Sequence, residues 1–191
     1  MLDEASTAEF HSLRKRGIGS SDISAIMGVS PWMTIQELYL DKTSEVTEYK
    51  DNWAMARGRE LEPVARDIYE FEFDVLMPAK RLVHPRFDYF LANTDGFNAE
   101  RNYGIEIKCP GKKDLELTFL KGEVPEKYIP QIQWQMLVAG SESWDYVCFD
   151  GKDKICVIRV SADKAYQRLM TKMARWFWFH VRNRIEIGGD R

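Results

Sequence analysis

The sequence predicts a mixed α/β fold in which helices pack on a central sheet. The 191-residue chain is long enough to form one domain with a sizeable core. Its composition, 45% hydrophobic and 30% charged, is that of a folded protein. Segments with helical periodicity and segments of alternating polarity follow one another along the chain. This order favours a single sheet covered by helices.

The N-terminal part of the chain is predicted to be helical. Residues 6–9 (STAE) fit a capping box that would start a helix running toward Arg14. A Gly/Ser loop follows, after which Ser21 or Asp22 could cap a short second helix. The stretch TIQELYLDK at 34–42 predicts a third helix.

The segment 51–73 has apolar residues near helical spacing and predicts a long amphipathic helix. Pro63 has no amide hydrogen to donate and disfavours a helical conformation at Glu62. We therefore expect this helix to kink or restart at that point.

The remaining chain predicts a cluster of strands, a helix, a hairpin and a last helix. The hairpin is indicated by two alternating segments that flank Gly-Lys-Asp, and the last helix by a capping serine. The expected elements are strands at 80–84, 87–94 and 103–109, a helix at 125–139, hairpin strands at 144–150 and 154–160, and a helix from Ser161 to about Asn183.

Several classes of protein are disfavoured by the composition. The stretch RWFWFHV (175–181) is too short for a membrane span, which needs roughly 20 apolar residues, so we expect it to be the packed face of the last helix. The N-terminus has no secretory pattern. Three cysteines and three histidines form no metal or triad pattern, which favours reduced, intracellular thiols. A net charge of −3 argues against a general nucleic-acid coat but not against a DNA enzyme with a local basic lining.

The segment GIEIK (104–108) contains two candidate catalytic residues. In a strand, Glu106 and Lys108 project to one face, while Ile105 and Ile107 project to the other. Asp95, in LANTDGF, lies eleven residues before Glu106, across an expected turn.

Two carboxylates on neighbouring strands could hold Mg²⁺ or Mn²⁺, which prefer oxygen ligands. The metal would activate a water for phosphodiester hydrolysis, and Lys108 could orient that water or stabilise the transition state. The pattern D-x(10)-E-x-K is weak on its own. An ordinary surface salt bridge on an edge strand is the alternative.

Five blocks in order strengthen the first interpretation. Together they resemble the lambda-exonuclease-like branch of the PD-(D/E)XK nucleases, also called the YqaJ viral recombinase family. The resemblance runs from about Leu13 to Gly140, and it rests on LRKRGIGSSDISAIMG (13–28), ARGRELEPVARDIYEF (56–71), LANTDGF (91–97), GIEIKCPG (104–111) and YIPQIQWQM (128–136).

The resemblance implies a restriction-endonuclease-like core, with a central mixed β-sheet flanked by helices. The catalytic core would cover about 13–140, and a C-terminal hairpin and helix would cover 141–191. It also implies a role for each matching residue. Asp95 and Glu106 match the metal-binding acids, and the backbone carbonyl of Ile107 would be a further metal ligand. Lys108 matches the catalytic lysine.

Four further positions match the family. Glu62 matches a helix-borne acid that supports the metal site, and Gln131 matches a glutamine that contacts the active-site water and lysine. Arg14 and Ser21 match residues that hold a terminal 5′-phosphate of DNA. Each has a simpler alternative: Glu62 could pair with an arginine one turn away, and Gln131 could belong to a polar stripe. Arg14 could be surface charge, and Ser21 could be only a cap.

The function implied is that of a Mg²⁺-dependent DNA exonuclease, with Mn²⁺ as an alternative metal. It would digest the 5′-ended strand of linear duplex DNA and leave 3′ single-stranded tails for phage-type recombination. The implied partners are duplex DNA with a 5′-phosphate, a single-strand annealing protein and two further copies in a trimeric ring, with no membrane. The expected location is cytoplasmic, in a bacterial host if phage-encoded. The alternatives are an endonuclease with the same core and a catalytically inactive DNA-binding or assembly module.

Overall fold

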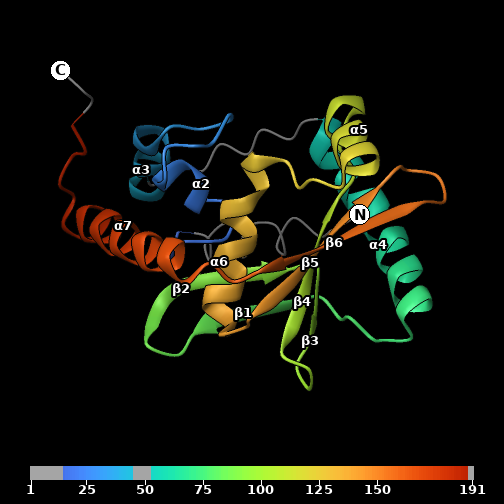
Figure 1. Cartoon of the computed structure of the whole chain (residues 1–191). Helices are drawn as coiled ribbons and strands as arrows, with labels where there is room; N and C mark the ends of the chain where they lie inside the picture. Colours follow the sequence, from blue (N-terminus) through green and yellow to red (C-terminus); the bar gives the residue numbers. More distant parts are fainter. Residues whose placement is uncertain (1–14, 45–52, 189–191) are drawn as a thin grey trace.

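A computed structural model describes residues 15–44 and 53–188 (Figure 1). Its helices and strands follow one another in the mixed order that the sequence predicts. In chain order they are α2 (Ile23–Ile26), α3 (Ile35–Thr43), α4 (Trp53–Phe73), β1 (Lys80–His84), β2 (Phe87–Thr94), β3 (Gly96–Asn98), β4 (Tyr103–Lys108), α5 (Lys112–Lys121), the 3₁₀ turn η1 (Glu126–Tyr128), α6 (Ile129–Ala139), β5 (Ser143–Phe149), β6 (Ile155–Ser161) and α7 (Lys164–Asn183).

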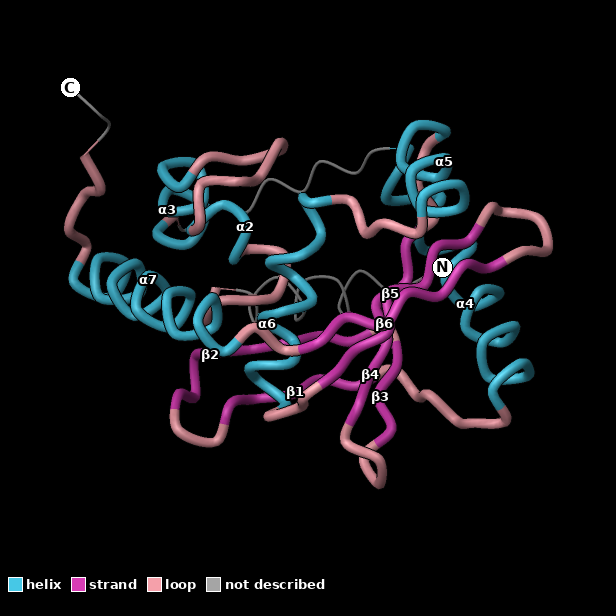
Figure 2. The backbone as a smooth tube through the Cα atoms, in the orientation of Figure 1, coloured by secondary structure: helices cyan, strands magenta, loops and turns pink. Residues whose placement is uncertain are grey.

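The central sheet has four strands in the order β3-β4-β5-β6. The β4–β5 pair is parallel, and the pairs on either side of it are antiparallel, so the sheet is mixed. Strands β1 and β2 form a separate antiparallel ribbon, which lies beside this sheet in Figure 2. The predicted mixed α/β fold with a central sheet flanked by helices is confirmed.

The two faces of the sheet bury different sets of side chains. Ile105 and Ile107 of β4 pack with Ala65 and Tyr69 of α4 in one cluster. In the other cluster, Tyr146 and its neighbours on β5 pack with apolar side chains of α6. Because successive residues of a strand alternate between faces, Glu106 points away from the isoleucines and toward α6.

A third cluster fills the space between α6, the β1–β2 ribbon and the helices α2, α3 and α7. Phe90 of β2 and Trp134 of α6 lie at its centre, with ring centroids 4.5 Å apart. Phe177 of α7 and Ile18 of the Gly/Ser loop are fully buried against them. This cluster fixes α6, which carries Gln131, and β2, which Asp95 directly follows.

The structure corrects the expectation that the chain kinks or restarts at Pro63. Helix α4 runs through Pro63 as one helix of 21 residues, with Glu62 inside it. Proline costs the helix one hydrogen bond, but Ala65 and Tyr69, two and six residues further on, are buried against the sheet. Packing thus holds the helix together across the missing bond.

Two elements were not predicted, and one cap was misplaced. Strand β3, which has only three residues, and helix α5 lie in stretches with no predicted structure. The hairpin that contains Glu106 and Lys108 is therefore β3–β4.

The last helix is capped by Asp163, which accepts hydrogen bonds from two amides of its first turn, whereas Ser161 ends β6. The helix predicted to run toward Arg14 lies outside the described residues.

The stretch 175–181 is only partly a packed face. Phe177 and Trp178 are buried, but Trp176 is 40% and Phe179 56% exposed. Trp32 is 66% exposed. No helix in 15–44 or 53–188 is long and apolar enough to cross a membrane.

Candidate active site

Strand β4 places a carboxylate inside the protein. Glu106 is 1% exposed, and β4 is paired on both sides, with β3 and with β5. Lys108 forms a salt bridge with Glu106 from the same face of the strand and is itself 24% exposed. The alternative of a surface salt bridge on an edge strand is therefore wrong.

Helix α6 supplies two amides to the same carboxylate. Gln131 donates to Oε1 of Glu106, the oxygen that also binds Lys108, and Gln135 donates to Oε2. Gln135 also donates to the backbone oxygen of Asn93 on β2, at 3.2 Å. Residues 131 and 135 are one helical turn apart and so lie on one face. Sequence reasoning assigned only Gln131 to the site, although this spacing was the signal that could have found Gln135.

Asp95 lies where β2 ends and β3 begins. Its Oδ2 accepts a hydrogen bond of 2.7 Å from the amide of Ile107, which ties the acid to the strand that carries Glu106. The next residue is Gly96, and a Cβ there would lie 2.8 Å from both Met77 and Ile105. Glycine is required because the chain passes this close to two core side chains, and this approach keeps Asp95 against β4.

Glu62 reaches the site from α4. It forms the predicted helical pair with Arg66, at 3.0 Å from Oε1 to Nη2. Besides burial, the negative charge of Glu62 raises the pKa of Asp95. The charge of Glu106 likewise raises the pKa of Glu62, and that of Lys108 lowers it. The simple alternative, a pair with an arginine one turn away, is thus correct as a contact. Glu62 pairs with Arg66 and at the same time interacts electrostatically with Asp95.

The charges of these groups are coupled. Burial and the Glu106 carboxylate raise the pKa of Asp95 well above its usual range. Burial also raises the pKa of Glu62, despite the opposing charge of Arg66. Burial would lower the pKa of Lys108, but the carboxylates of Glu106 and Asp95 outweigh it, so the pKa is raised. Lys108 is therefore a stable ammonium at neutral pH, and two of the acids resist ionisation.

This donor set fits a hard cation that keeps some of its waters. Within 15–44 and 53–188, no group of three or more His, Cys, Asp or Glu side chains is arranged to hold a metal. A metal here would need Asp95, Glu106, the Ile107 carbonyl and water, which suits Mg²⁺. Burial and the neighbouring negative charges raise the pKa of Asp95, and a bound cation would offset both effects.

An aromatic and basic rim lies beside Lys108. The Lys108 ammonium is 5.5 Å from the ring centroid of Tyr128, and that ring lies 6.3 Å from Trp32 in a stacked arrangement. Lys127 lies 5.4 Å from the Trp32 ring and pairs with Asp114 at 2.6 Å. Trp32 is thus an exposed aromatic surface beside Tyr128, whose ring faces the Lys108 ammonium.

The two predicted phosphate-binding residues are only partly placed. Arg14 lies outside the described residues. Ser21 is exposed, and the N-cap position before α2 belongs to Asp22, whose side chain makes no cap hydrogen bond. Instead, Asp22 Oδ2 binds Lys42 of α3 at 2.6 Å and accepts from the Gly19 amide at 2.8 Å. This buried ion pair fixes the Gly/Ser loop that presents Ser21.

The sequence matches a known protein family and a bacterial relative. The model of the YqaJ-like viral recombinase domain matches residues 9–142. The chain belongs to this family. It is also 32% identical over 142 residues to the uncharacterized protein YqaJ of Bacillus subtilis (strain 168), a match that covers 73% of this chain and 44% of YqaJ. The predicted resemblance is confirmed.

Two solved structures share the fold of this chain. The alkaline exonuclease LHK-Exo of Laribacter hongkongensis matches with a TM-score of 0.77 and 26% identity, over 94% of each chain. A phage-related exonuclease of Haemophilus somnus 129PT matches with a TM-score of 0.69 and 14% identity, over 92% of this chain and 98% of that chain, and this likeness supports the fold alone. Family and fold together support a nuclease role.

Proposed function

We propose that this protein is a Mg²⁺- or Mn²⁺-dependent DNA exonuclease that digests the 5′-ended strand of linear duplex DNA and leaves 3′ single-stranded tails. One observation carries the proposal. Glu106 is buried in the central sheet and is held at once by Lys108, Gln131 and Gln135, beside Asp95. Burying a carboxylate is costly unless it is paired and hydrogen-bonded, and these three donors hold Glu106 in the interior beside Asp95. The alkaline exonuclease LHK-Exo, which shares the fold, supports an exonuclease in particular.

Each group would have a distinct task. Asp95, Glu106 and the Ile107 carbonyl would hold the metal, which when bound lowers the pKa of a coordinated water and offsets charge on the scissile phosphate. Lys108 is an ammonium and so cannot accept a proton. It would donate hydrogen bonds to the attacking water or to a phosphate oxygen, which stabilises the charge that develops there.

The supporting residues keep the acid in place. Gln131 and Gln135 bind both oxygens of Glu106 and fix its orientation, a role that outer-sphere partners commonly have in metal sites. Glu62 would add negative charge at the edge of the site. Ser21, together with Arg14, would bind the 5′-phosphate of the DNA end.

The proposal includes a trimeric ring around duplex DNA and a single-strand annealing protein as partner. Both follow from the family resemblance. Sedimentation of the purified protein would give the mass of the assembly, and co-purification with the annealing protein would test the second partner.

The direct test compares DNA with and without ends. Purified protein with Mg²⁺ should digest end-labelled linear duplex and leave a covalently closed circle intact, and a 5′-phosphate should speed digestion. Lys108→Ala should lose activity while keeping its fold by circular dichroism. Cleavage of the circle would instead identify an endonuclease. DNA binding without turnover in Mg²⁺ or Mn²⁺ would leave only a binding module.

A further inference from the structure

A basic and aromatic groove lies on helix α7, away from the residues assigned above. It has a volume of about 810 Å³ and includes Tyr89 of β2 on one side. Its ten lining residues include four cations and no carboxylate. They are Tyr89, Arg168, Thr171, Lys172, Arg175, Trp176, Trp178, Phe179, Arg182 and Asn183.

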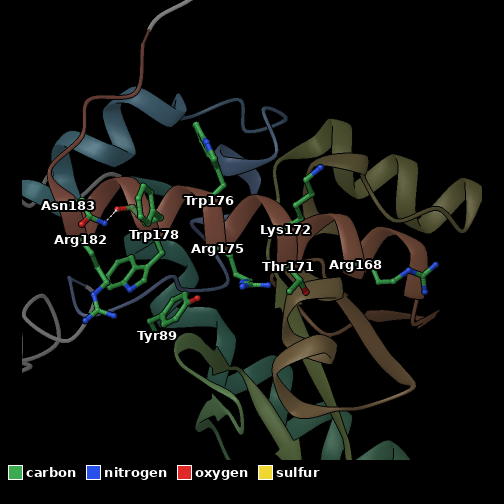
Figure 3. Close-up of a pocket in the computed structure, with 10 residues that line it drawn as sticks. Tyr89, Arg168, Thr171, Lys172, Arg175, Trp176, Trp178, Arg182 and Asn183 are labelled. Atoms are coloured by element: carbon green, nitrogen blue, oxygen red, sulfur yellow. Dashed lines mark hydrogen bonds between the residues drawn. The ribbon is translucent and has the colours of Figure 1, made fainter.

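The side chains form two rows along the helix. In Figure 3, Lys172 and Trp176 project from one side of α7, while Arg175 points from the other side toward Tyr89. The Tyr89 ring stacks on Trp178, with centroids 5.5 Å apart and planes 9° apart. Tyr89 and Trp178 therefore form a firm floor, and the cations flank it.

The groove leaves aromatic surface uncovered. Trp176 is 40% and Phe179 56% exposed, and both lie between cationic side chains of the same helix. The chain as a whole carries a net charge of −3, so this concentration of positive charge is local. Cations interleaved with exposed aromatic rings match a ligand that has both phosphates and unpaired bases.

We propose that this groove binds single-stranded DNA, and the proposal rests on the nuclease function argued above. From Arg168 to Arg182 the helix spans about 21 Å at ~1.5 Å per residue. That length covers about six nucleotides at the ~3.4 Å spacing of a strand within a duplex, and fewer of a more extended strand. Cations would meet the phosphates, and Trp176 and Phe179 would stack on bases. A symmetric contact between the α7 faces of two copies is disfavoured, since the two faces carry like charge.

The position relative to the active site fits a product strand. Tyr89 and Asp95 lie near opposite ends of β2, about 20 Å apart at ~3.3 Å per residue. The strand left behind when its complement is digested would be single-stranded at about this distance from the scissile bond. The groove would then retain the product strand rather than take part in cleavage.

Fluorescence anisotropy with a labelled oligo-dT 20-mer tests the groove. The measurement uses the full chain in EDTA, so that neither binding nor its failure depends on hydrolysis. Arg168→Glu with Lys172→Glu should weaken binding at least tenfold and lower the slope of log affinity against log salt by about 1.4, at ~0.7 per phosphate contact. Lys152→Glu with Lys154→Glu is the matched control, in the β5–β6 turn at the opposite end of the molecule (Figure 1), and should change affinity less than twofold.

A second pair tests stacking without a change of charge. Phe179→Ala should weaken oligo-dT binding about five- to tenfold, as loss of one stacked base does. Phe71→Ala removes an 88% exposed ring of α4 and should have no effect. Failure of the wild-type chain to bind oligo-dT, or equal affinity in the Arg168/Lys172 variant, would overturn the proposal. So would a variant that changes the sedimentation mass but not the affinity, because the face would then be a subunit contact. Loss of hydrolysis alone would count against the proposed function and not against the groove.

Discussion

The ion pair of Lys42 and Asp22 gives a quantitative prediction about the loop that presents Ser21. The two charged atoms are 2.6 Å apart, and the side chains are 0% and 3% exposed. At an effective dielectric constant of ~20, the attraction is about 6 kcal/mol. Desolvation of the two ions offsets most of this, so the pair adds little net stability. Removing one partner is different, because the remaining buried charge loses its ion pair but keeps its desolvation cost.

We therefore expect Lys42→Met to lower the free energy of unfolding by about 3–5 kcal/mol. For a chain of this size, 1 kcal/mol corresponds to ~2–4 °C, so the Tm should fall by about 10 °C. Lys112→Met is the control, since Lys112 is 87% exposed and lies 3.7 Å from Glu116. Breaking that surface pair should cost less than about 1 kcal/mol.

Urea denaturation of the two variants, with no metal present, measures these differences. The double variant Asp22→Asn with Lys42→Met removes both charges of the pair and should recover part of the lost stability. Equal stability of Lys42→Met and Lys112→Met would refute the reasoning. Lys42→Met should also weaken the preference for a 5′-phosphorylated end at temperatures where the variant is folded, because the loop is no longer fixed.

Three further predictions concern the active site. The raised pKa of Asp95 means that its ionised form is disfavoured in the folded protein, so stability should fall as pH rises above 3.8 toward the raised value. Asp95→Asn should therefore make the metal-free protein more stable at pH 7 by thermal unfolding while abolishing hydrolysis; a lower Tm would contradict this. Protons compete with metal at the same carboxylate, so Mn²⁺ affinity by calorimetry should be lower below the raised pKa of Asp95 than above it, and an affinity that does not fall at acid pH would count against it. Trp32→Ala should slow digestion of duplex ends about five- to tenfold through lost base stacking, whereas Phe71→Ala should not, and equal rates would remove Trp32 from the DNA path.

The central part of the site was predictable because it depends on local geometry. The alternation of β4 puts Glu106 and Lys108 on one face whatever the rest of the fold. The helical spacing of α6 likewise brings Gln131 and Gln135 to one face. The turn predicted after Asp95 lies at residues 99–102, whereas Gly96 itself begins β3.

Other features depend on contacts that local patterns do not encode. Trp32 is exposed because it stacks on Tyr128 at the rim instead of entering the core, and nothing nearby in the sequence fixes that choice. Pro63 remains helical because α4 is held by the sheet. Strand β3 is too short for a polarity pattern to be recognised. Helix α5, between Gly111 and Gly122, did carry usable signals in its flanking glycines.

The central claim is that Asp95 and Glu106 together hold a divalent cation that DNA hydrolysis requires. Calorimetric titration of Mn²⁺ into the wild-type chain, Asp95→Asn and Glu106→Gln, with DNA hydrolysis measured on the same samples, tests it most directly. We expect the wild-type chain to bind and hydrolyse, and each variant to lose both while remaining folded. Full metal binding or full hydrolysis by either variant would contradict the account.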